Sequence, residues 1–473
     1  MERSECLQRL RGARCTVVGL GVSNRPLIEF LLNAGATLTA RDAKERAAFG
    51  EELDALEARG VRLILGNGYL DGIDEDVIFR SPGIRPDIPP FCDAVARGAR
   101  LTSEMELFME LCPATVIGIT GSDGKTTTTT LTGLFLERAC ERRGYGRVYV
   151  GGNIGTPLLD RVFDMTPDDF AVVELSSFQL MNMKCAPHIA AITNLSPNHL
   201  NWHTDMDEYV AAKTHIYTGA ACRCLVTNAE NGYTAALARD TALPKTYFSS
   251  VKQRSTEFAL GENDRAVYER EGVVYLFDGV REHAIVNAAD IFLPGRHNLE
   301  NYMTAIALTD GWVDSETVRA IAPDFKGVPH RLEPVREFEG VSYYNSSIDS
   351  SPTRTAAALS AMKQKPIVIC GGSDKGTPFE PLAEALCTSA KAVILTGESA
   401  PKIRAALAKR PEVQSGSFPV LEAPDFDSAV RLSRTIAKEG DAVLLSPACA
   451  SFDAFKNFME RGERFRAIVN GFT

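Results

Sequence analysis

The segment at residues 115–136 limits what this chain can fold into more than any other part of the sequence. The apolar run TVIGIT (115–120) leads directly into the loop GSDG (121–124), and Lys125-Thr126 then opens a stretch whose leucines have helical spacing. A buried strand that turns through glycines into a helix brings backbone N–H groups and the positive end of a helix dipole to one point. The segment therefore predicts an α/β sheet with a phosphate site at its carboxyl edge.

The chemistry of this loop follows from its residue types. In a phosphate loop the lysine reaches the β- and γ-phosphates and the next hydroxyl ligates Mg²⁺, and here these residues are Lys125 and Thr126. The spacing is shorter than the usual G-x-x-x-x-G-K-[ST], so the alternative is a glycine-bearing surface loop with an incidental Lys-Thr pair. The strand–loop–helix context favours phosphate binding. The residues assigned to the loop are Gly121, Ser122, Asp123, Gly124, Lys125, Thr126 and Thr127.

A carboxylate at the end of a second apolar run is a candidate metal ligand. Glu174 ends the run FAVVE (170–174). Sheets of α/β proteins place ligands at the carboxyl ends of their strands, and nucleotide enzymes hold Mg²⁺ there. From these residues alone, a strand-end carboxylate in water is an equally good interpretation of Glu174.

Three of the seven histidines, His199, His203 and His215, lie close together in the sequence. A structural zinc site requires four converging ligands, and the nearby Cys222-x-Cys224 does not supply a familiar spacing. We therefore interpret His203 and His215 as ordinary packed or exposed histidines.

The pattern of strand, glycine turn and helix occurs in three regions. In the first, a strand at 15–18 is followed by Gly19-x-Gly21, a helix at 26–35 and a strand that ends at Asp42, where a ribose-binding acid is expected. This turn alone suits NAD, a UDP-sugar or a structural role. The third region has buried strands at 366–369, 392–395 and 442–445. We predict an α/β fold of three consecutive domains, 1–102, 103–327 and 328–473.

Composition excludes several classes of protein. With 473 residues, 45% hydrophobic and 24% charged, the chain is an ordinary globular protein rather than a disordered or disulfide-rich one. The net charge of −10 argues against a non-specific nucleic-acid binder. No apolar run is long enough for a membrane helix, and the acidic start lacks the apolar core of a secretory signal. Eleven cysteines without a C-x-x-C pair suit reduced thiols, so we expect a soluble cytoplasmic protein.

A last block, SPACAS (446–451), follows a predicted strand. Phe452, Phe455 and Phe458 come directly after it with the spacing of one helix face. A stripe of aromatic residues at this spacing is typical of a helix that packs on a core. We therefore expect a helix that begins near Phe452 and buries these rings.

Together these blocks resemble the Mur ligases, which form amide bonds at the expense of ATP in peptidoglycan synthesis. The segments that match their central region are GSDGKT (121–126), GNIG (152–155), ELSSFQL (174–180), NLSPNH (194–199), YVAAK (209–213), LPGRHNLEN (293–301) and HRLE (330–333). The segments GGSDKG (371–376), LSPACASFD (445–453) and KNFMERG (456–462) are similar to the branch that adds glutamate. The D-x-N-P-R-type block of the diaminopimelate-adding branch is absent from the sequence.

The resemblance implies an N-terminal Rossmann-like domain that binds the UDP precursor, a central P-loop ATPase-like domain and a C-terminal Rossmann-like domain that binds glutamate. In such a ligase, ATP phosphorylates the alanyl carboxylate of UDP-N-acetylmuramoyl-L-alanine, and the amine of D-glutamate then displaces phosphate. The implied partners are these substrates and ATP, without nucleic acid or membrane, and the implied state is a monomer.

The resemblance also implies roles for individual residues. The implied catalytic residues are Lys125, Asn153, Glu174, His199 and Lys213. Two Mg²⁺ ions are implied, with Thr126 and Glu174 as ligands of one, and His199 and a carbamylated Lys213 as ligands of the other. The implied nucleotide contacts outside the loop are Asn298, Asn301 and Arg331. The implied contacts of the UDP moiety and of glutamate are Ser23, Asp42, Ser81, Ser350, Lys375, Ser451 and Phe458, the last through its backbone.

The sequence departs from the family pattern mainly in the run NSSIDS (345–350), where N-D-S-x-A-T is usual. Ser346 replaces an aspartate that normally helps to hold the nucleotide ribose, and Asp349 replaces a small residue. Asp123 in place of Asn, and Asn24 in place of Gly, are further departures.

Three alternatives to a ligase that adds D-glutamate remain at this point. One is a related amide ligase that adds L-glutamate or resembles folylpolyglutamate synthase. Another is a catalytically silent scaffold, although the residues such a protein would lose, among them Lys125 and Glu174, are present. A dehydrogenase that uses Gly19-x-Gly21 leaves the phosphate loop unexplained.

Overall fold

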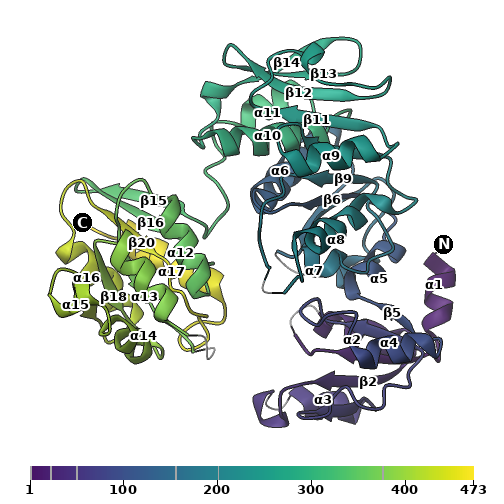
Figure 1. Ribbon diagram of the computed structural model, residues 1–473, viewed down its shortest axis with the longest axis horizontal. Coiled ribbons are helices and arrows are strands. Elements are labelled where there is room, and N and C mark those ends of the chain that lie inside the picture. Colours follow the sequence, from purple (N-terminus) through teal and green to yellow (C-terminus); the bar gives the residue numbers. More distant parts are fainter. Residues whose placement is uncertain (1–2, 22–23, 50–51, 155–156, 201, 375–377) are drawn as a thin grey trace. The chain divides into compact units, whose positions relative to one another are not determined.

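The computed structural model describes residues 3–21, 24–49, 52–154, 157–200, 202–374 and 378–473 of the chain. The chain divides into two compact units, Met1–Phe325 and Lys326–Thr473. The first unit contains a five-stranded and a nine-stranded sheet, and the second contains a six-stranded sheet (Figure 1). This confirms the predicted α/β class. The domain boundaries at 102 and 327 stay predictions.

The five-stranded sheet has the order β3-β2-β1-β4-β5, and all its neighbours are parallel. Its strands are β1 (Arg14–Val18), β2 (Thr37–Asp42), β3 (Arg62–Leu65), β4 (Val77–Arg80) and β5 (Arg100–Thr102). Its helices are α1 (Arg3–Leu10), α2 (Asn24–Asn33), η1 (Arg46–Ala48), α3 (Glu52–Ala58) and α4 (Pro89–Ala96). The strand order reverses between β1 and β4, so the loops after these two strands flank the switch point where such sheets bind ligands.

The nine-stranded sheet has the order β14-β13-β12-β11-β10-β9-β6-β8-β7. Its strands are β6 (Thr115–Thr120), β7 (Val148–Gly152), β8 (Phe170–Glu174), β9 (Ile189–Ile192), β10 (Cys224–Asn228), β11 (Lys245–Ser249), β12 (Arg265–Arg270), β13 (Val273–Phe277) and β14 (Glu282–Asn287). The strands from β7 to β12 are parallel, whereas β13 and β14 add an antiparallel edge that the sequence analysis did not predict. The parallel part brings the carboxyl ends of β6, β7, β8 and β9 to one edge.

The remaining helices of the first unit include α6, which begins directly after the candidate phosphate loop. They are α5 (Glu104–Leu111), α6 (Lys125–Arg143), η2 (Leu159–Arg161), α7 (Ser177–Leu180), α8 (Met206–Thr218), α9 (Gly232–Asp240), η3 (Ser255–Glu257), η4 (Ala288–Asp290), α10 (Arg296–Leu308) and α11 (Ser315–Ile321). None of the helices in the described part of the chain is both long and apolar enough to cross a membrane.

The six-stranded sheet has the order β15-β16-β20-β17-β18-β19, and only its first pair is antiparallel. Its strands are β15 (Glu333–Phe338), β16 (Val341–Asn345), β17 (Ile367–Cys370), β18 (Ala392–Leu395), β19 (Val420–Glu422) and β20 (Ala442–Leu445). Its helices are α12 (Pro352–Ala361), α13 (Glu380–Ser389), α14 (Ala400–Leu407), α15 (Pro411–Gln414), α16 (Phe426–Ile436) and α17 (Phe458–Asn470).

The expected aromatic helix after residue 451 is wrong in its start. Helix α17 begins at Phe458, because Asn457 accepts a hydrogen bond from the Glu460 N–H and caps it at this point. Phe452 lies before the helix and its side chain is 70% exposed, so it does not belong to the core. The local spacing was misleading because a capping residue lies within the aromatic run.

We predict that the centre of α6 is essential for the stability of the first unit. Phe135 is fully buried, and its ring lies 6.0 Å from that of Tyr302 in α10. Phe135→Ala is expected to lower the free energy of unfolding by about 3–5 kcal/mol, because it leaves a cavity. Denaturant unfolding measures this, with Tyr145→Ala as the control, since Tyr145 is 60% exposed. Equal effects of the two substitutions would contradict the prediction.

Candidate active site

The loop between β6 and α6, the candidate phosphate loop, turns through two glycines with positive φ. Gly121 and Gly124 have φ of 147° and 77°, which side-chain-bearing residues rarely adopt. A Cβ on Gly121 would lie 1.9 Å from Thr193 Oγ1, so the backbone of the loop passes directly against the end of β9. The backbone N–H groups of Ser122 and Asp123 donate to the main-chain and side-chain oxygens of Asn194. The segment that follows β9 therefore helps to hold the loop in place.

Three of the predicted site residues meet at the carboxyl edge of this sheet. Thr126 donates its hydroxyl proton to Glu174 Oε2 at 2.7 Å, and Asn153 Nδ2 donates to Glu174 Oε1 at 2.8 Å. Glu174 is 2% exposed and ends β8 beside the loop. Lys125 bends back over the loop, where its Nζ donates to the carbonyls of Gly121 and Ser122. A hydroxyl and a carboxylate side by side are the oxygen ligands that Mg²⁺ prefers.

Lys213 contacts the same loop from helix α8. It lies in α8 and is 1% exposed, and its Nζ donates to Thr120 Oγ1 and to the Gly121 carbonyl, both at 3.0 Å. Burial lowers the pKa of this amine well below its ordinary value, and the charge of Lys125 lowers it further, whereas Glu174 raises it. The site therefore favours an uncharged amine, which is the form that reacts with CO₂.

His199 is exposed, with a φ of 56°, in the segment after β9. Its ring lies 4.9 Å from that of Phe178 in α7, and this helix follows Glu174 closely. His199 therefore packs on the short helix that follows Glu174 in the chain. His203 is packed, as interpreted from the sequence: its ring nitrogens contact Ser177 Oγ and Glu208. Burial lowers the pKa of His203.

Helix α10 borders the loop on the side where the nucleotide contacts are expected. Asn301 accepts from Thr128 Oγ1 at 3.3 Å, and a Cβ on Gly124 would lie 2.4 Å from Asn301 Oδ1. Asn298 accepts from Asn301 Nδ2 and donates to the Pro294 carbonyl. The structure therefore brings both asparagines to the phosphate loop. Arg331 lies in the second unit, where its side chain is exposed.

In the five-stranded sheet, the predicted UDP contacts Asp42 and Ser81 lie at the carboxyl ends of β2 and β4. Asp42 accepts from the N–H groups of Leu20 and Lys44. The turn after β4 begins at Ser81, and a Cβ on Gly19 would lie 2.7 Å from Ser81 Cβ, so the two turns at the switch point touch. Ser23 lies outside the described residues.

In the second unit, two of the predicted glutamate contacts, Ser451 and Phe458, lie next to the partners of a buried arginine. Arg461 is 2% exposed and donates to the carbonyls of Ser347, Cys449 and Ala450, and the Ser347 hydroxyl donates to the Phe458 carbonyl. Ser451, directly after this loop, is also buried. Ser350 lies in the turn after β16, with its N–H bonded to the Ile348 carbonyl. Lys375 lies outside the described residues.

Sequence reasoning missed several residues that shape the phosphate loop. Tyr209 lies one helical turn before Lys213, and its hydroxyl contacts Ser122 Oγ at 2.9 Å. Thr193 Oγ1 donates to the Asp123 carbonyl at 2.6 Å. The i, i+4 spacing of Tyr209 and Lys213 was a usable signal, whereas nothing local marks Thr193 or Arg461.

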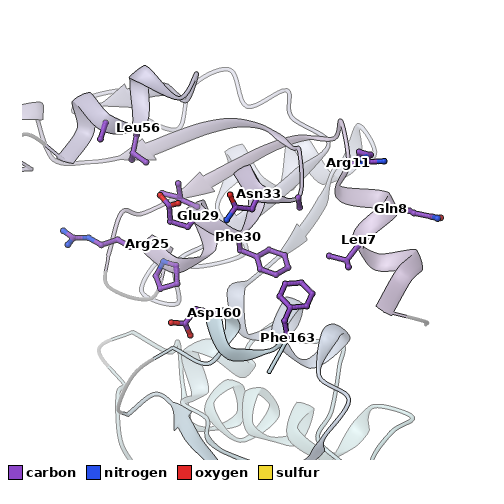
Figure 2. A pocket seen from close by; sticks show the side chains of 14 residues that line it. Leu7, Gln8, Arg11, Arg25, Glu29, Phe30, Asn33, Leu56, Asp160 and Phe163 are labelled. Atoms are coloured by element: carbon purple, nitrogen blue, oxygen red, sulfur yellow. The ribbon is translucent and has the colours of Figure 1, made fainter. Parts of the chain in front are cut away.

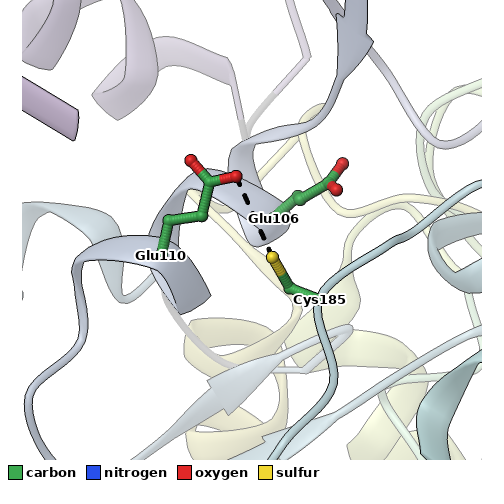
Figure 3. A group of neighbouring side chains, drawn as sticks. All are labelled: Glu106, Glu110 and Cys185. Carbon is green, nitrogen blue, oxygen red and sulfur yellow. Dashed lines mark hydrogen bonds between the residues drawn. The ribbon is translucent and has the colours of Figure 1, made fainter. Parts of the chain in front are cut away.

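The first unit also contains an apolar cavity and a cluster of acidic and thiol side chains. A largely apolar cavity of about 970 Å³ lies among α1, α2, α3 and the 160–163 segment, where the rings of Phe30 and Phe163 stack (Figure 2). It contains none of the predicted site residues. Glu106, Glu110 and Cys185 form a cluster with metal-ligand types (Figure 3). Its carboxylates bind Arg100, Thr102 and the Lys184 N–H, so the cluster ties α5 to the 184–185 segment.

Comparison with known proteins agrees with this geometry. The description "Mur ligase middle domain" matches residues 119–309, and "Mur ligase, glutamate ligase domain" matches residues 330–449. The chain belongs to the Mur ligase family. It is 42% identical to the UDP-N-acetylmuramoylalanine–D-glutamate ligase of Acetivibrio thermocellus, over 98% of this chain and 97% of that one. It is 44% identical to the enzyme of that name from Clostridium botulinum strain Okra, over 97% and 96% of the two chains.

Solved structures show the same fold at low sequence identity. The murein peptide ligase of Psychrobacter arcticus superposes with a TM-score of 0.51 at 17% identity and covers 98% of this chain and 100% of that one. The UDP-N-acetylmuramate–alanine ligase of Thermotoga maritima gives a TM-score of 0.51 at 18% identity, over 97% of this chain and 99% of that one. The Mur ligase architecture is thus retained where most residues differ.

We predict that Gly121→Ala disrupts the phosphate loop of this Mur ligase. The substitution places a Cβ against Thr193 and imposes a positive φ on alanine, which costs about 1–3 kcal/mol. If this cost falls on the binding-competent loop, the affinity for ADP with Mg²⁺ is expected to fall by about tenfold or more. Calorimetric titration measures the change. Gly232→Ala is the matched control, since a Cβ there meets no atom within 4 Å; equal affinities of the two variants would count against the prediction.

Proposed function

We propose that this chain joins D-glutamate to UDP-N-acetylmuramoyl-L-alanine with consumption of ATP in peptidoglycan precursor synthesis. One observation carries the proposal: Thr126, Glu174 and Lys213 converge on a glycine loop built for phosphate, in a chain whose curated relatives are named for this reaction. Because ATP and UDP-linked precursors are made in the cytoplasm, we place the enzyme there, and we propose that it acts as a monomer.

The reaction requires activation of a carboxylate. The alanyl carboxylate attacks the γ-phosphorus of ATP and forms an acyl phosphate with release of ADP. The uncharged amine of D-glutamate then attacks the acyl carbon, and the tetrahedral intermediate expels phosphate as the amide forms and the amine loses a proton. Several anions meet at one point in this sequence, so positive charge must be concentrated there.

Residues of the first unit provide this environment. Lys125 and the N–H groups of the loop that do not donate to Asn194 bind the β- and γ-phosphates. Asn153, which donates to Glu174, is assigned to the acyl phosphate. When bound, Mg²⁺ supplies charge neutralisation at the phosphates. Thr126 and Glu174 fit one ion because their oxygens are adjacent. A carbamate on Lys213 and the imidazole of His199 would hold a second ion.

The other assignments divide the substrates between the sheets. Ser23, Asp42 and Ser81 bind the UDP moiety, and Asn298, Asn301 and Arg331 bind the nucleotide of ATP. Ser350 and Lys375 bind one carboxylate of glutamate, and Ser451 with the backbone of Phe458 binds the other. An L-glutamate-adding ligase is the second candidate, because both enantiomers carry the same charges.

We predict that phosphate release from ATP requires D-glutamate. With UDP-N-acetylmuramoyl-L-alanine, Mg²⁺ and bicarbonate present, D-glutamate is expected to support release together with formation of the ligated product, and L-glutamate is not. Coupled phosphate detection and mass spectrometry of the product measure both. Release with L-glutamate alone keeps the mechanism and overturns the stereochemistry, whereas release with neither in a folded, ADP-binding sample overturns the proposal.

We predict that Lys213 forms a carbamate. Burial lowers the pKa of its amine well below the ordinary value, which favours the uncharged form that reacts with CO₂. Incubation with ¹³C-bicarbonate is expected to give one protein-bound carbamate signal by NMR, which Lys213→Met removes. Lys409→Met is the control, because Lys409 is exposed and paired with Glu380. Removal of CO₂ is expected to lower the activity of the wild type reversibly. A signal that survives in Lys213→Met refutes the assignment.

A further inference from the structure

Arg80 is a buried arginine that connects the two sheets of the first unit. It is the last residue of β4, and its side chain is 1% exposed. On one side, Nη1 donates to the carbonyls of Ser81, Pro82 and Ile84, the last at 2.9 Å. These carbonyls belong to the turn that touches Gly19 at the switch point of the five-stranded sheet.

The other side of the guanidinium binds the segment 178–182, which follows strand β8 of the nine-stranded sheet. Nη2 donates to the Phe178 carbonyl at 2.8 Å, and both Nη2 and Nε donate to Asn182 Oδ1, at 2.6 and 3.0 Å. Phe178 lies in α7, which follows Glu174, and its ring packs against His199. One side chain thus bonds both to the turn assigned to the UDP moiety and to the helix between two assigned metal ligands.

The acceptors of Arg80 in these contacts are neutral carbonyl and amide oxygens. Burial lowers its pKa to about 10, which leaves the guanidinium charged at neutral pH. A planar fork of N–H donors fixes the relative position of the groups that it binds, which the single ammonium of lysine does not do. A second arginine, Arg85, reinforces this junction by binding Glu208 and the Trp202 carbonyl and by stacking on the Trp202 ring.

We propose that Arg80 is a positioning residue that fixes the distance between the UDP-binding turn and the Glu174–His199 segment. This inference rests on the proposed function. The substrate is held by its nucleotide at one sheet and reacts at its alanyl carboxylate at the other, so the separation of the two sites decides where the carboxylate lies relative to the γ-phosphate. A misplacement of about 1 Å at a reacting group can cost about a hundredfold in rate.

The test uses the full-length protein and the variants Arg80→Lys and Arg80→Met. We expect kcat for phosphate release to fall by about 10- to 100-fold. The dissociation constants of ADP and of UDP-N-acetylmuramoyl-L-alanine, measured by calorimetry, are expected to stay within about threefold. This separation of rate from binding is the signature of positioning. A kcat near the wild-type value, or a loss explained by weaker binding of either ligand, overturns the inference.

Arg41→Lys is the matched control, because Arg41 is also 1% exposed in the same sheet. Its contacts are Thr16 in β1 and Tyr69, Asp71 and Glu75 in the segment between β3 and β4, so none of them reaches the nine-stranded sheet. It should alter stability without the loss of kcat. If the Arg80 variants do not fold, Asn182→Ala removes two of the bridging hydrogen bonds and is expected to give the same pattern with a smaller loss. A normal rate in a folded Asn182→Ala protein then overturns the inference.

Hydrogen exchange separates this inference from the proposed function. With UDP alone as the probe, wild-type protein should show slower exchange in both the 81–84 turn and the 177–182 segment, and Arg80→Lys should show it only in the turn. That result supports the coupling even if the wild type fails to ligate D-glutamate, which would refute only the proposed function. Equal protection of both segments in the variant refutes the coupling.

Discussion

The phosphate loop depends on the close approach of its backbone to β9 and on the buried amine beneath it. Because Gly121 has no side chain, its backbone lies directly against Thr193. In this position the carbonyl of Gly121 accepts a hydrogen bond from Lys213. The same carbonyl accepts from Lys125. Two lysines on one carbonyl oxygen would repel each other if both were charged, and burial resolves this by favouring the neutral form of Lys213. The conformation of the loop and the protonation of Lys213 therefore depend on each other.

Strand order then decides which other groups reach this point. β6 lies between β8 and β9, so Glu174 and the segment after β9 flank the loop on its two sides. β7 lies beyond β8 and brings Asn153 to the far side of the carboxylate. Parallel strands place all these ends at one edge, and the antiparallel strands β13 and β14 extend the sheet away from it. The edge hairpin joins the sheet at β12, away from the strands that carry the candidate site residues.

Much of this was predictable where the signal is local. The loop glycines, Lys125 and the strand-end Glu174 can be recognised from a few neighbouring residues. The alternation of strands and helices predicted the α/β class. The junction at Arg80 was not predictable, because its partners Phe178 and Asn182 lie about a hundred residues away and are mostly neutral oxygens with no charge to complement. The predicted start of the helix after residue 451 was wrong for another reason, because the capping residue Asn457 lies inside the Phe452–Phe458 run and outweighs its periodicity.

The departures at residues 346 and 349 show how the second unit tolerates an altered motif. Ser346 stands where the family usually has aspartate, and its oxygen accepts from the Leu332 N–H at 3.1 Å. The carboxylate of Asp349 interacts with Ser346 and accepts from Ser446 Oγ at 2.8 Å. Burial raises the pKa of Asp349, and the two hydroxyls oppose that rise. Through Asp349 and Ser446 the turn after β16, which contains Ser350, is therefore tied to the loop after β20, which leads to Ser451.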